Sequence, residues 1–128
     1  MKLLLGIDLA EVDRVAGALE RWGDRFVARV FCAGELSGRR RHLRARAEHV
    51  AGRFAAKEAA MKALGTGWRG VSFREIEVRP DPRGKPTLTF HGRALARAEQ
   101  LGVESVEVTI SHSRNAAVAV VALITRDR

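Results

Sequence analysis

Residues 42–65, HLRARAEHVAGRFAAKEAAMKALG, form the longest run of good helix formers in the chain. Alanine, arginine, glutamate and lysine predominate in it, and all four favour the α-helix. Gly65 stands where a residue in the left-handed conformation commonly ends a helix. The stretch therefore predicts one long helix over residues 42–64, against which the rest of the chain has to pack.

Short segments with strand character lie on both sides of this helix. Residues 2–8 form a mainly apolar run. Residues 73–79 and 86–90 flank the segment Asp81-Pro82-Arg83-Gly84, whose residues are typical of a tight turn. Apolar and polar residues alternate over 106–112, as in a strand with one exposed face.

Two further helices and a central strand complete the predicted elements. Apolar residues recur at helical spacing over 12–22, and a short helix over 93–101 is expected to end at Gly102. Residues 116–124 are continuously apolar and rich in valine, which favours a central strand buried on both faces. Without repeats or linkers, the sequence predicts a single mixed α/β (α+β) domain over residues 1–128.

The composition favours an anionic partner. The chain carries a formal net charge of +8 with a sequence pI near 11.1. A cluster of arginines supports a small nucleic-acid-binding domain without enzymatic activity as one alternative: Arg39, Arg40, Arg41, Arg44 and Arg46. Aromatic residues, on which bases would stack, make up only 5% of the chain. We therefore expect no nucleic acid as the main partner.

We expect a cytoplasmic protein that does not enter a membrane. The single cysteine, Cys32, cannot form an internal disulfide, so nothing ties the chain to an oxidising compartment. The apolar N-terminus is interrupted by Asp8 and Glu11 before any signal-peptide cleavage site. No stretch approaches the ~20 apolar residues of a membrane span.

The predicted long helix carries two charged pairs, each spaced four residues apart. Arg53 and Lys57 share one side of it, and Glu58 and Lys62 share another. A glutamate followed by lysine at this spacing is also a common helix-stabilising pair, worth ~0.3–0.5 kcal/mol. However, the like charges of Arg53 and Lys57 repel unless an anion lies nearby, and the surrounding alanines let a ligand approach closely. The helix is therefore a candidate catalytic segment, with a simple ion pair as the alternative.

Asp8 ends the first apolar strand, where an unpaired buried charge would be costly. It either leads into the helix over 12–22 or serves as a ligand for a hard cation. Magnesium sites commonly use one or two carboxylates together with phosphate oxygens and water. Asp8 and Glu58 would supply that number if the fold brings them together.

The segment GTGWRG at 65–70 matches a dinucleotide-binding fingerprint letter for letter. That fingerprint works between a strand and a following helix, and here the order is reversed. The sequence therefore argues against a Rossmann site. Amides in this glycine turn remain candidates for holding a phosphate.

Arg14, Arg21 and Arg25 point in nearly the same direction if one helix continues through residue 25, because offsets of seven and eleven residues almost complete whole turns. This line is either an ordinary solvated helix face or a docking strip for an acidic helix. His112, at the end of a predicted strand, is a core or rim residue or a site residue.

Taken in order, these segments resemble the holo-acyl-carrier-protein synthase family of 4′-phosphopantetheinyl transferases. The matching pieces are Gly6-Ile7-Asp8 with Glu11 and Arg14, residues 53–59, residues 62–67, Gly84-Lys85-Pro86 and Ile110-Ser111-His112. They spread over nearly the whole chain. One departure is that Ser113 and Arg114 follow His112, where the family often has an acidic residue.

The resemblance implies a mostly antiparallel sheet packed against a long helix, the 4′-phosphopantetheinyl transferase fold. It implies transfer of 4′-phosphopantetheine from coenzyme A to a serine of an acidic apo acyl carrier protein, with release of adenosine 3′,5′-bisphosphate, in fatty acid biosynthesis. It also implies Mg²⁺ held by Asp8, Glu58 and the coenzyme A pyrophosphate, and a homotrimer with active sites at the subunit interfaces.

The resemblance also distributes roles among the residues, with Asp8, Glu58 and Lys62 as the catalytic set. Coenzyme A is expected to contact Arg53, Lys57, Gly65, Thr66, Lys85, Pro86 and His112. Carrier-protein docking falls to Arg14, Arg21 and Arg25. Fixed cations would stabilise the charge that develops on the phosphates. Glu58, Lys62 or a metal-bound water could accept the serine proton, and we favour Glu58.

Overall fold

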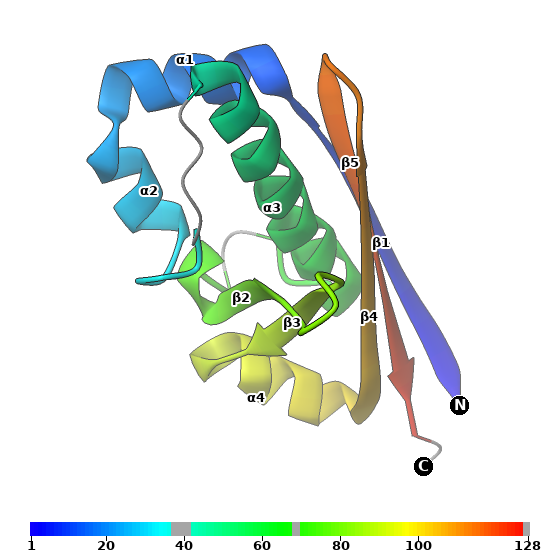
Figure 1. Ribbon diagram of the computed structural model, residues 1–128. Coiled ribbons are helices and arrows are strands. Elements are labelled where there is room, and N and C mark those ends of the chain that lie inside the picture. Colours follow the sequence, from blue (N-terminus) through cyan, green and yellow to red (C-terminus); the bar gives the residue numbers. More distant parts are fainter. Residues whose placement is uncertain (37–41, 68–69, 127–128) are drawn as a thin grey trace.

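The computed structural model describes residues 1–36, 42–67 and 70–126, and Figure 1 shows their arrangement. The described helices are α1 (Val12–Trp22), α2 (Asp24–Val30), α3 (Leu43–Leu64) and α4 (Gly92–Leu101), with a 3-10 turn, η1, at Phe73–Glu75. The strands are β1 (Lys2–Glu11), β2 (Ile76–Pro80), β3 (Pro86–Phe90), β4 (Val103–His112) and β5 (Ala116–Thr125). The arginines at 39–41 and residues 68–69 of the glycine turn lie outside the described residues.

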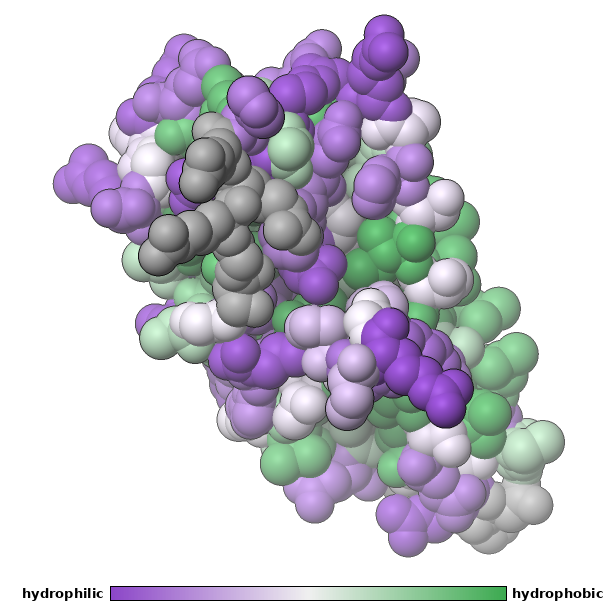
Figure 2. Space-filling view, viewed as in Figure 1, coloured by the Kyte–Doolittle hydropathy of each residue, from purple (hydrophilic) through white to green (hydrophobic). Residues whose placement is uncertain are grey.

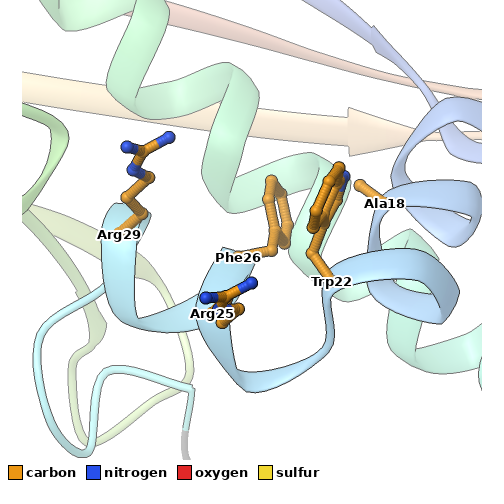
Figure 3. A pocket seen from close by; sticks show the side chains of 5 residues that line it. All are labelled: Ala18, Trp22, Arg25, Phe26 and Arg29. Carbon is orange, nitrogen blue, oxygen red and sulfur yellow. The ribbon is translucent and has the colours of Figure 1, made fainter.

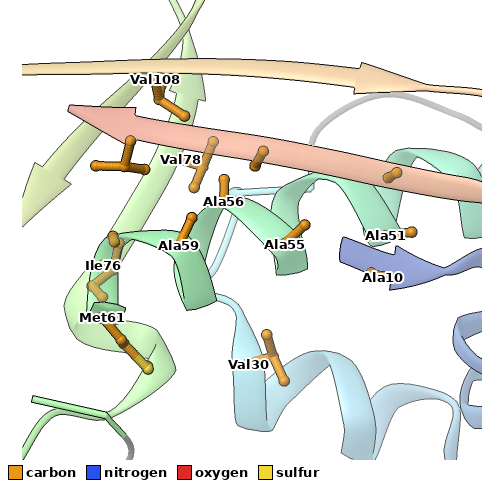
Figure 4. Close-up of a cluster of buried hydrophobic side chains, with 14 of the residues drawn as sticks. Ala10, Val30, Ala51, Ala55, Ala56, Ala59, Met61, Ile76, Val78 and Val108 are labelled. Carbon is orange, nitrogen blue, oxygen red and sulfur yellow. The ribbon is translucent and has the colours of Figure 1, made fainter. Parts of the chain in front are cut away.

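The long helix α3 is the element against which the sheet packs, as its sequence predicts. It ends at Gly65, whose backbone is left-handed (φ 74°) and whose N–H donates to the carbonyl of Lys62. Small residues on its buried side let the neighbouring strands approach closely (Figure 4). These residues are Ala51, Ala55, Ala56, Ala59, Ala60 and Ala63.

Three antiparallel strands form the main sheet, in the order β1-β5-β4. β5 is the central strand, as its continuous apolar sequence predicts. β2 and β3 form a separate antiparallel hairpin, in which β2 contacts α3 and β3 contacts β4. The predicted mixed α/β fold, with an antiparallel sheet packed against a long helix, is confirmed.

Two strand boundaries differ from the sequence prediction. β1 continues beyond Asp8 because its residues up to Glu11 remain paired with β5. The segment that was expected to begin a strand at Phe73 first makes the turn η1. The carboxylate of Glu75 accepts a hydrogen bond from the backbone N–H of Ser72 at 2.8 Å, which holds this turn, and β2 starts only at Ile76.

The two faces of the main sheet differ in how they are covered. On the side of α3, alternate residues of β5 are 0% exposed: Ala117, Ala119, Val121 and Leu123. The opposite face of β5 is only half-buried, and the neighbouring leucines and isoleucine of β1 are 58–62% exposed: Leu3, Leu5, Ile7 and Leu9. Figure 2 shows hydrophobic residues along this side of the molecule. Within one chain, the expected burial of β5 on both faces is therefore wrong, because only one face has a covering layer.

Candidate active site

β1 and α3 cross at Gly6, and this crossing brings two carboxylates together. A Cβ atom on Gly6 would lie 1.8 Å from the carbonyl oxygen of Ala59, so only glycine allows the approach. Asp8 lies two residues further along β1 and points to the same side of the sheet. Glu58 directly precedes Ala59 on α3. The crossing therefore places the Asp8 and Glu58 side chains in contact.

Lys62, one helical turn after Glu58, completes the cluster. Its Nζ lies 2.8 Å from Oδ1 of Asp8 and donates a hydrogen bond to the carbonyl of Ile7 at 3.1 Å. The hydrogen bond and the negative charge of Asp8 raise the pKa of Lys62. Lys62 is therefore more than the helix-stabilising partner of Glu58, because it joins α3 to β1.

The environment of Glu58 opposes its negative charge. Burial, followed by the charge of Asp8 and a hydrogen bond with it, raises the pKa of Glu58 to about 7, although Lys62 acts in the opposite direction. A carboxyl group with this pKa can accept or release a proton near neutral pH. Such a shift is common in catalytic sites, where neighbouring charges and burial tune the acidity of a side chain.

Asp8 and Glu58 also fit a divalent cation. Two adjacent carboxylates repel each other unless a proton or a cation lies between them, and the raised pKa of Glu58 reflects this repulsion. Among the described residues, no group of three or more His, Cys, Asp or Glu side chains is arranged to hold a metal. Magnesium needs no such group, since phosphate oxygens and water complete its coordination.

The two carboxylates line a cavity of about 420 Å³ that has an apolar wall. Arg14 and the rings of Phe26 and Phe54 also line it. The centroid of the Phe54 ring lies 6.3 Å from that of Phe26, which also lines the cavity, and 5.2 Å from that of Phe73, which supports Phe54 from outside the lining. A cavity with charged groups at one side and an apolar wall suits a ligand with a phosphate and a less polar arm.

Lys57 does not reach this cavity, which corrects the prediction that it contacts a phosphate. Its side chain is 0% exposed, and Nζ lies 2.8 Å from Oε2 of Glu35. Nζ also donates to the carbonyls of Phe73, at 2.9 Å, and Ile76. Burial lowers the pKa of Lys57, while Glu35 acts against this shift. The anion that relieves the repulsion between Arg53 and Lys57 is therefore a carboxylate of the protein; Arg53 itself is half-buried.

Gly65 and Thr66 lie at the C-terminal end of α3, seven and eight residues beyond Glu58, which corresponds to roughly 10–12 Å along the helix axis. Their backbone N–H groups donate to the carbonyls of Lys62 and Met61. These two amides are occupied in ending the helix and are not free to cradle a phosphate, so the prediction for the glycine turn does not apply to them. Their side chains and the turn that follows remain at this end of the site.

Lys85, Pro86 and His112 lie apart from the Asp8–Glu58 cluster within one chain. Lys85 forms an ion pair with Glu107 (2.9 Å) and, with Pro86, lines a separate cavity of about 290 Å³ against β4 and β5. His112 is the exposed last residue of β4. The fold thus brings Asp8, Glu58, Lys62 and Arg14 together, and leaves these three on the β3 hairpin and on β4, the edge strand opposite β1.

Arg14, Arg21 and Arg25 are all exposed, but they do not form one line on one helix. Gly23 (φ 50°) interrupts the helix, so Arg25 belongs to α2. The two helices enclose a surface cavity of about 570 Å³, in which Trp22 and Phe26 lie side by side with Arg25 and Arg29 at the edge (Figure 3). The surface is therefore an arginine-flanked apolar hollow rather than a strip.

Several residues that shape the site escaped the sequence analysis. Gly6 was noted only as part of a motif, although its missing side chain sets the approach of β1 to α3. Glu35 carries no local signal of burial, and its contact with Lys57 joins residues 22 positions apart. Phe54 and Phe73 could have been suspected only as apolar residues, because their stacking depends on the tertiary fold.

The fold and the carboxylate site define a family. The family model described as the 4′-phosphopantetheinyl transferase superfamily matches residues 4–121, and the chain belongs to this family. The expected resemblance is thereby confirmed.

Individual relatives agree with this assignment. The chain is 53% identical over 120 residues to a holo-[acyl-carrier-protein] synthase of Solidesulfovibrio magneticus, covering 93% of this chain and 95% of the relative. A crystal structure of a holo-(acyl-carrier-protein) synthase from Bacillus anthracis, in complex with CoA (3′,5′-ADP), is 39% identical with a TM-score of 0.74, covering 96% of both chains. The Helicobacter pylori holo-[acyl-carrier-protein] synthase in complex with coenzyme A gives 27% identity and a TM-score of 0.80, covering 94% of this chain and all of that one.

Within residues 1–36, 42–67 and 70–126, no helix has the length and apolar character that a membrane crossing requires.

Proposed function

We propose that this protein transfers the 4′-phosphopantetheine group of coenzyme A to a serine of an apo acyl carrier protein, releasing adenosine 3′,5′-bisphosphate. The observation that carries this proposal is the meeting of Asp8 and Glu58 at the wall of one cavity, with Lys62 paired to Asp8. Two carboxylates can hold a divalent cation, and a cation beside an ammonium group is suited to binding and polarising a pyrophosphate. The relatives described above bear the name of this activity.

A magnesium ion is the cofactor in this proposal, with Asp8 and Glu58 as its protein ligands. When bound, the ion would neutralise charge on the pyrophosphate oxygens. The close approach of the two carboxylates supports this assignment, because it is unfavourable without a positive charge or a proton between them.

In the reaction, the carrier serine oxygen attacks the phosphorus on the pantetheine side, and a new phosphorus–oxygen bond forms. The bond to the second phosphate breaks, and its electron pair stays on the adenosine bisphosphate. Lys62, held 2.8 Å from Asp8, is placed to stabilise the charge on the phosphates. Glu58 accepts the serine proton, directly or through a water molecule.

The carrier protein docks on the surface formed by α1 and α2. Arg14, Arg21 and Arg25 are exposed there, and Arg14 also lines the cavity of Asp8 and Glu58. An acidic helix bound along these arginines would therefore lie beside the carboxylate site. Charge complementarity of this kind accelerates association and fixes the orientation of the partner.

The protein assembles as a homotrimer through the exposed face of its sheet. Leucines and an isoleucine of β1 are 58–62% exposed on that face, which is unusual for an apolar patch on a monomer. Lys85 directly precedes β3 and Pro86 begins it, in the separate hairpin, whereas His112 ends β4, the edge strand opposite β1. In such an assembly they could contact coenzyme A bound at a neighbour's Asp8–Glu58 site, together with that neighbour's Arg53, Gly65 and Thr66. The proposal also places the enzyme in the cytoplasm, in agreement with its single cysteine.

The decisive experiment incubates the protein with an apo acyl carrier protein, coenzyme A and Mg²⁺ and follows the mass of the carrier. We expect the mass to rise by one phosphopantetheine group, and we expect a chelator to prevent this. An unchanged carrier mass in the presence of Mg²⁺ would contradict the proposal. If the protein instead bound RNA or DNA with steep salt dependence, the nucleic-acid-binding alternative would replace it.

A further inference from the structure

Lys57 and Glu35 form a buried ion pair in which the ammonium group and both carboxylate oxygens make hydrogen bonds. Lys57 is 0% and Glu35 1% exposed. The three ammonium hydrogens of Lys57 meet three acceptors: the Glu35 carboxylate and the carbonyls of Phe73 and Ile76. The Lys57 ammonium also lies 5.0 Å from the ring centroid of Phe31. A buried charge is tolerated only when it is paired and hydrogen-bonded in this way.

Glu35 extends the pair into a junction of three segments. Its carboxylate accepts hydrogen bonds from the backbone N–H groups of Val78, at 2.8 Å, and Cys32, at 2.9 Å. Val78 belongs to β2, whose other edge pairs with β3. Glu35 and Lys57 together therefore bind the free edge of β2, one at an N–H and the other at the carbonyl of Ile76. The junction ties the segment after α2, the strand β2 and the helix α3 to one another.

The junction adds directional contacts to the alanine-rich surface of α3, beside those that Lys62 makes with β1. The buried contacts of this surface with the sheet come largely from small side chains, which interlock little (Figure 4). Apolar contacts are not directional, so a smooth helix surface resists rotation and sliding only weakly. The hydrogen bonds of Lys57 are directional and attach α3 to β2 at one defined rotation.

That rotation decides where Glu58 points. Lys57 and Glu58 are consecutive, so their side chains leave the helix about 100° apart. One faces β2, and the other faces Asp8 on β1. With a side-chain radius of roughly 5–6 Å, a helix rotation of about 10° moves the Glu58 carboxylate by about 1 Å. Functional groups must be held within about 0.5 Å of the productive geometry.

We propose that Glu35 and Lys57 are positioning residues for the catalytic cluster: their buried pair sets the rotation of α3 that aims Glu58 at Asp8. This inference rests on the proposed function for its catalytic consequence. It assigns Lys57 a role that acts through Glu58 and gives it no contact with coenzyme A.

The test uses the variant E35Q/K57M, which removes both charges together. The glutamine carbonyl can still accept the Val78 N–H, and no uncompensated buried charge remains, so the protein should fold. We expect kcat for transfer to fall by about 10- to 100-fold, while KM for coenzyme A changes by less than about threefold. A KM that rises with an unchanged kcat would overturn the proposal, since it would mean that Lys57 binds the substrate. Wild-type kcat would also overturn it.

The control V78A separates positioning from stability. It removes buried volume from β2 beside the junction but leaves the Val78 N–H and the ion pair intact. We expect V78A to lower Tm and to keep kcat within about twofold of wild type. A loss of kcat in V78A that scales with the loss of Tm, and matches that of E35Q/K57M, would overturn the positioning role.

A crystal structure of E35Q/K57M provides a measurement that does not depend on activity. We expect the separation of the Asp8 and Glu58 carboxylates to change by about 1 Å relative to wild type. Unchanged carboxylate positions would overturn the inference. If the wild-type protein itself transferred no phosphopantetheine, only the proposed function would fail, because the crystallographic comparison would still decide the positioning role.

Discussion

Glu58 is a carboxylate whose surroundings favour a proton or a cation. Its folded-state pKa of about 7 exceeds its usual value of 4.5, so the folded protein holds the proton more tightly than the unfolded chain. The stabilisation from this proton is complete below about pH 4.5 and is lost as the pH rises through 7. Above pH 7, and without a metal, the ionised Glu58 therefore costs stability.

Glu58→Gln should remove the loss of stability that ionised Glu58 causes, and the same change should abolish catalysis. Glutamine resembles the protonated carboxyl group, so we expect the variant to be more stable than wild type by about 1 kcal/mol at pH 8 without metal, after allowing for solvent screening of the half-exposed side chain. At pH 4 the two proteins should unfold alike. Urea unfolding at both pH values measures this difference. Transfer activity should fall by at least about 100-fold.

Glu104→Gln, a change at an exposed position of β4, is the matched control for this comparison. It should alter stability equally at both pH values. A Glu58→Gln variant that is less stable than wild type at pH 8 would mean that the Glu58 carboxylate is stabilised as an anion in the metal-free protein.

Single residues show where sequence reasoning succeeds and where it stops. Glu58 and Lys62 could be selected because helical spacing fixes their relation, and Asp8 because it interrupts an apolar strand. The same spacing led to the wrong prediction that Lys57 contacts a phosphate. Its partner Glu35 lies 22 residues away, and the sequence around neither residue indicates that it is buried. Local patterns report neighbours on one element, whereas the burial of a charge depends on elements that meet only in the fold.

The contact between β1 and α3 depends on one missing side chain. Gly6→Ala would place a Cβ 1.8 Å from the carbonyl oxygen of Ala59, a backbone atom that cannot rotate away. Either the strand shifts or the fold weakens, and we expect a loss of about 1–3 kcal/mol in unfolding free energy. Because Asp8 moves with the strand, kcat should fall more than about tenfold even in the folded fraction. Denaturant unfolding and steady-state kinetics measure the two effects.

Gly17→Ala on α1 is the matched control for Gly6→Ala. A Cβ on Gly17 meets no atom within 4 Å, so alanine there should stabilise the helix by about 0.5–1 kcal/mol. Equal stabilities for the two alanine variants would contradict the role of Gly6 as a close-approach residue.

The helices α1 and α2 present the surface assigned to the carrier protein. Reversing two charges with Arg21→Glu/Arg25→Glu should raise KM for an acidic carrier protein by at least about tenfold, with a much smaller effect on KM for coenzyme A, because neither side chain lines the cavity of Asp8 and Glu58. Arg74→Glu/Arg83→Glu makes the same change in net charge at exposed positions near the β2–β3 hairpin and should leave both constants close to wild type. Equal increases in KM for the carrier protein and in KM for coenzyme A would mean that these arginines attract anionic substrates in general and do not form a carrier-protein docking site.

Most elements were predictable because their signals are local. The long α3 has strong helix formers and a terminal glycine, and β4 alternates with period two. The predicted end of the helix over 12–22 agrees with α1, but spacing alone does not give the direction of the chain after Gly23. The change of direction there places Arg25 on α2, where it lines the hollow beside Trp22 and Phe26.

The sequence of β5 reads as a strand buried on both faces, yet the single chain buries only the face toward α3. The apolar outer residues of β5 lie beside the exposed leucines and isoleucine of β1, so the two strands together leave one continuous apolar face uncovered. A second layer supplied by other copies of the chain would bury this face. It would also explain why Lys85 and His112, expected near coenzyme A, lie away from Glu58 within one chain.

Leu5→Glu/Ile7→Glu tests this assembly. Both residues are about 60% exposed on the uncovered face, so carboxylates there should not disturb the fold of one chain. We expect wild-type protein to sediment as a trimer and the variant as a folded monomer with transfer activity reduced by at least about tenfold, because the neighbour's Lys85 and His112 would be absent from the site. Leu95→Glu, on α4 and similarly exposed, should stay trimeric and active. A wild-type protein that sediments as a monomer with full activity would show that one chain completes the site alone, and the apolar face would then need another partner.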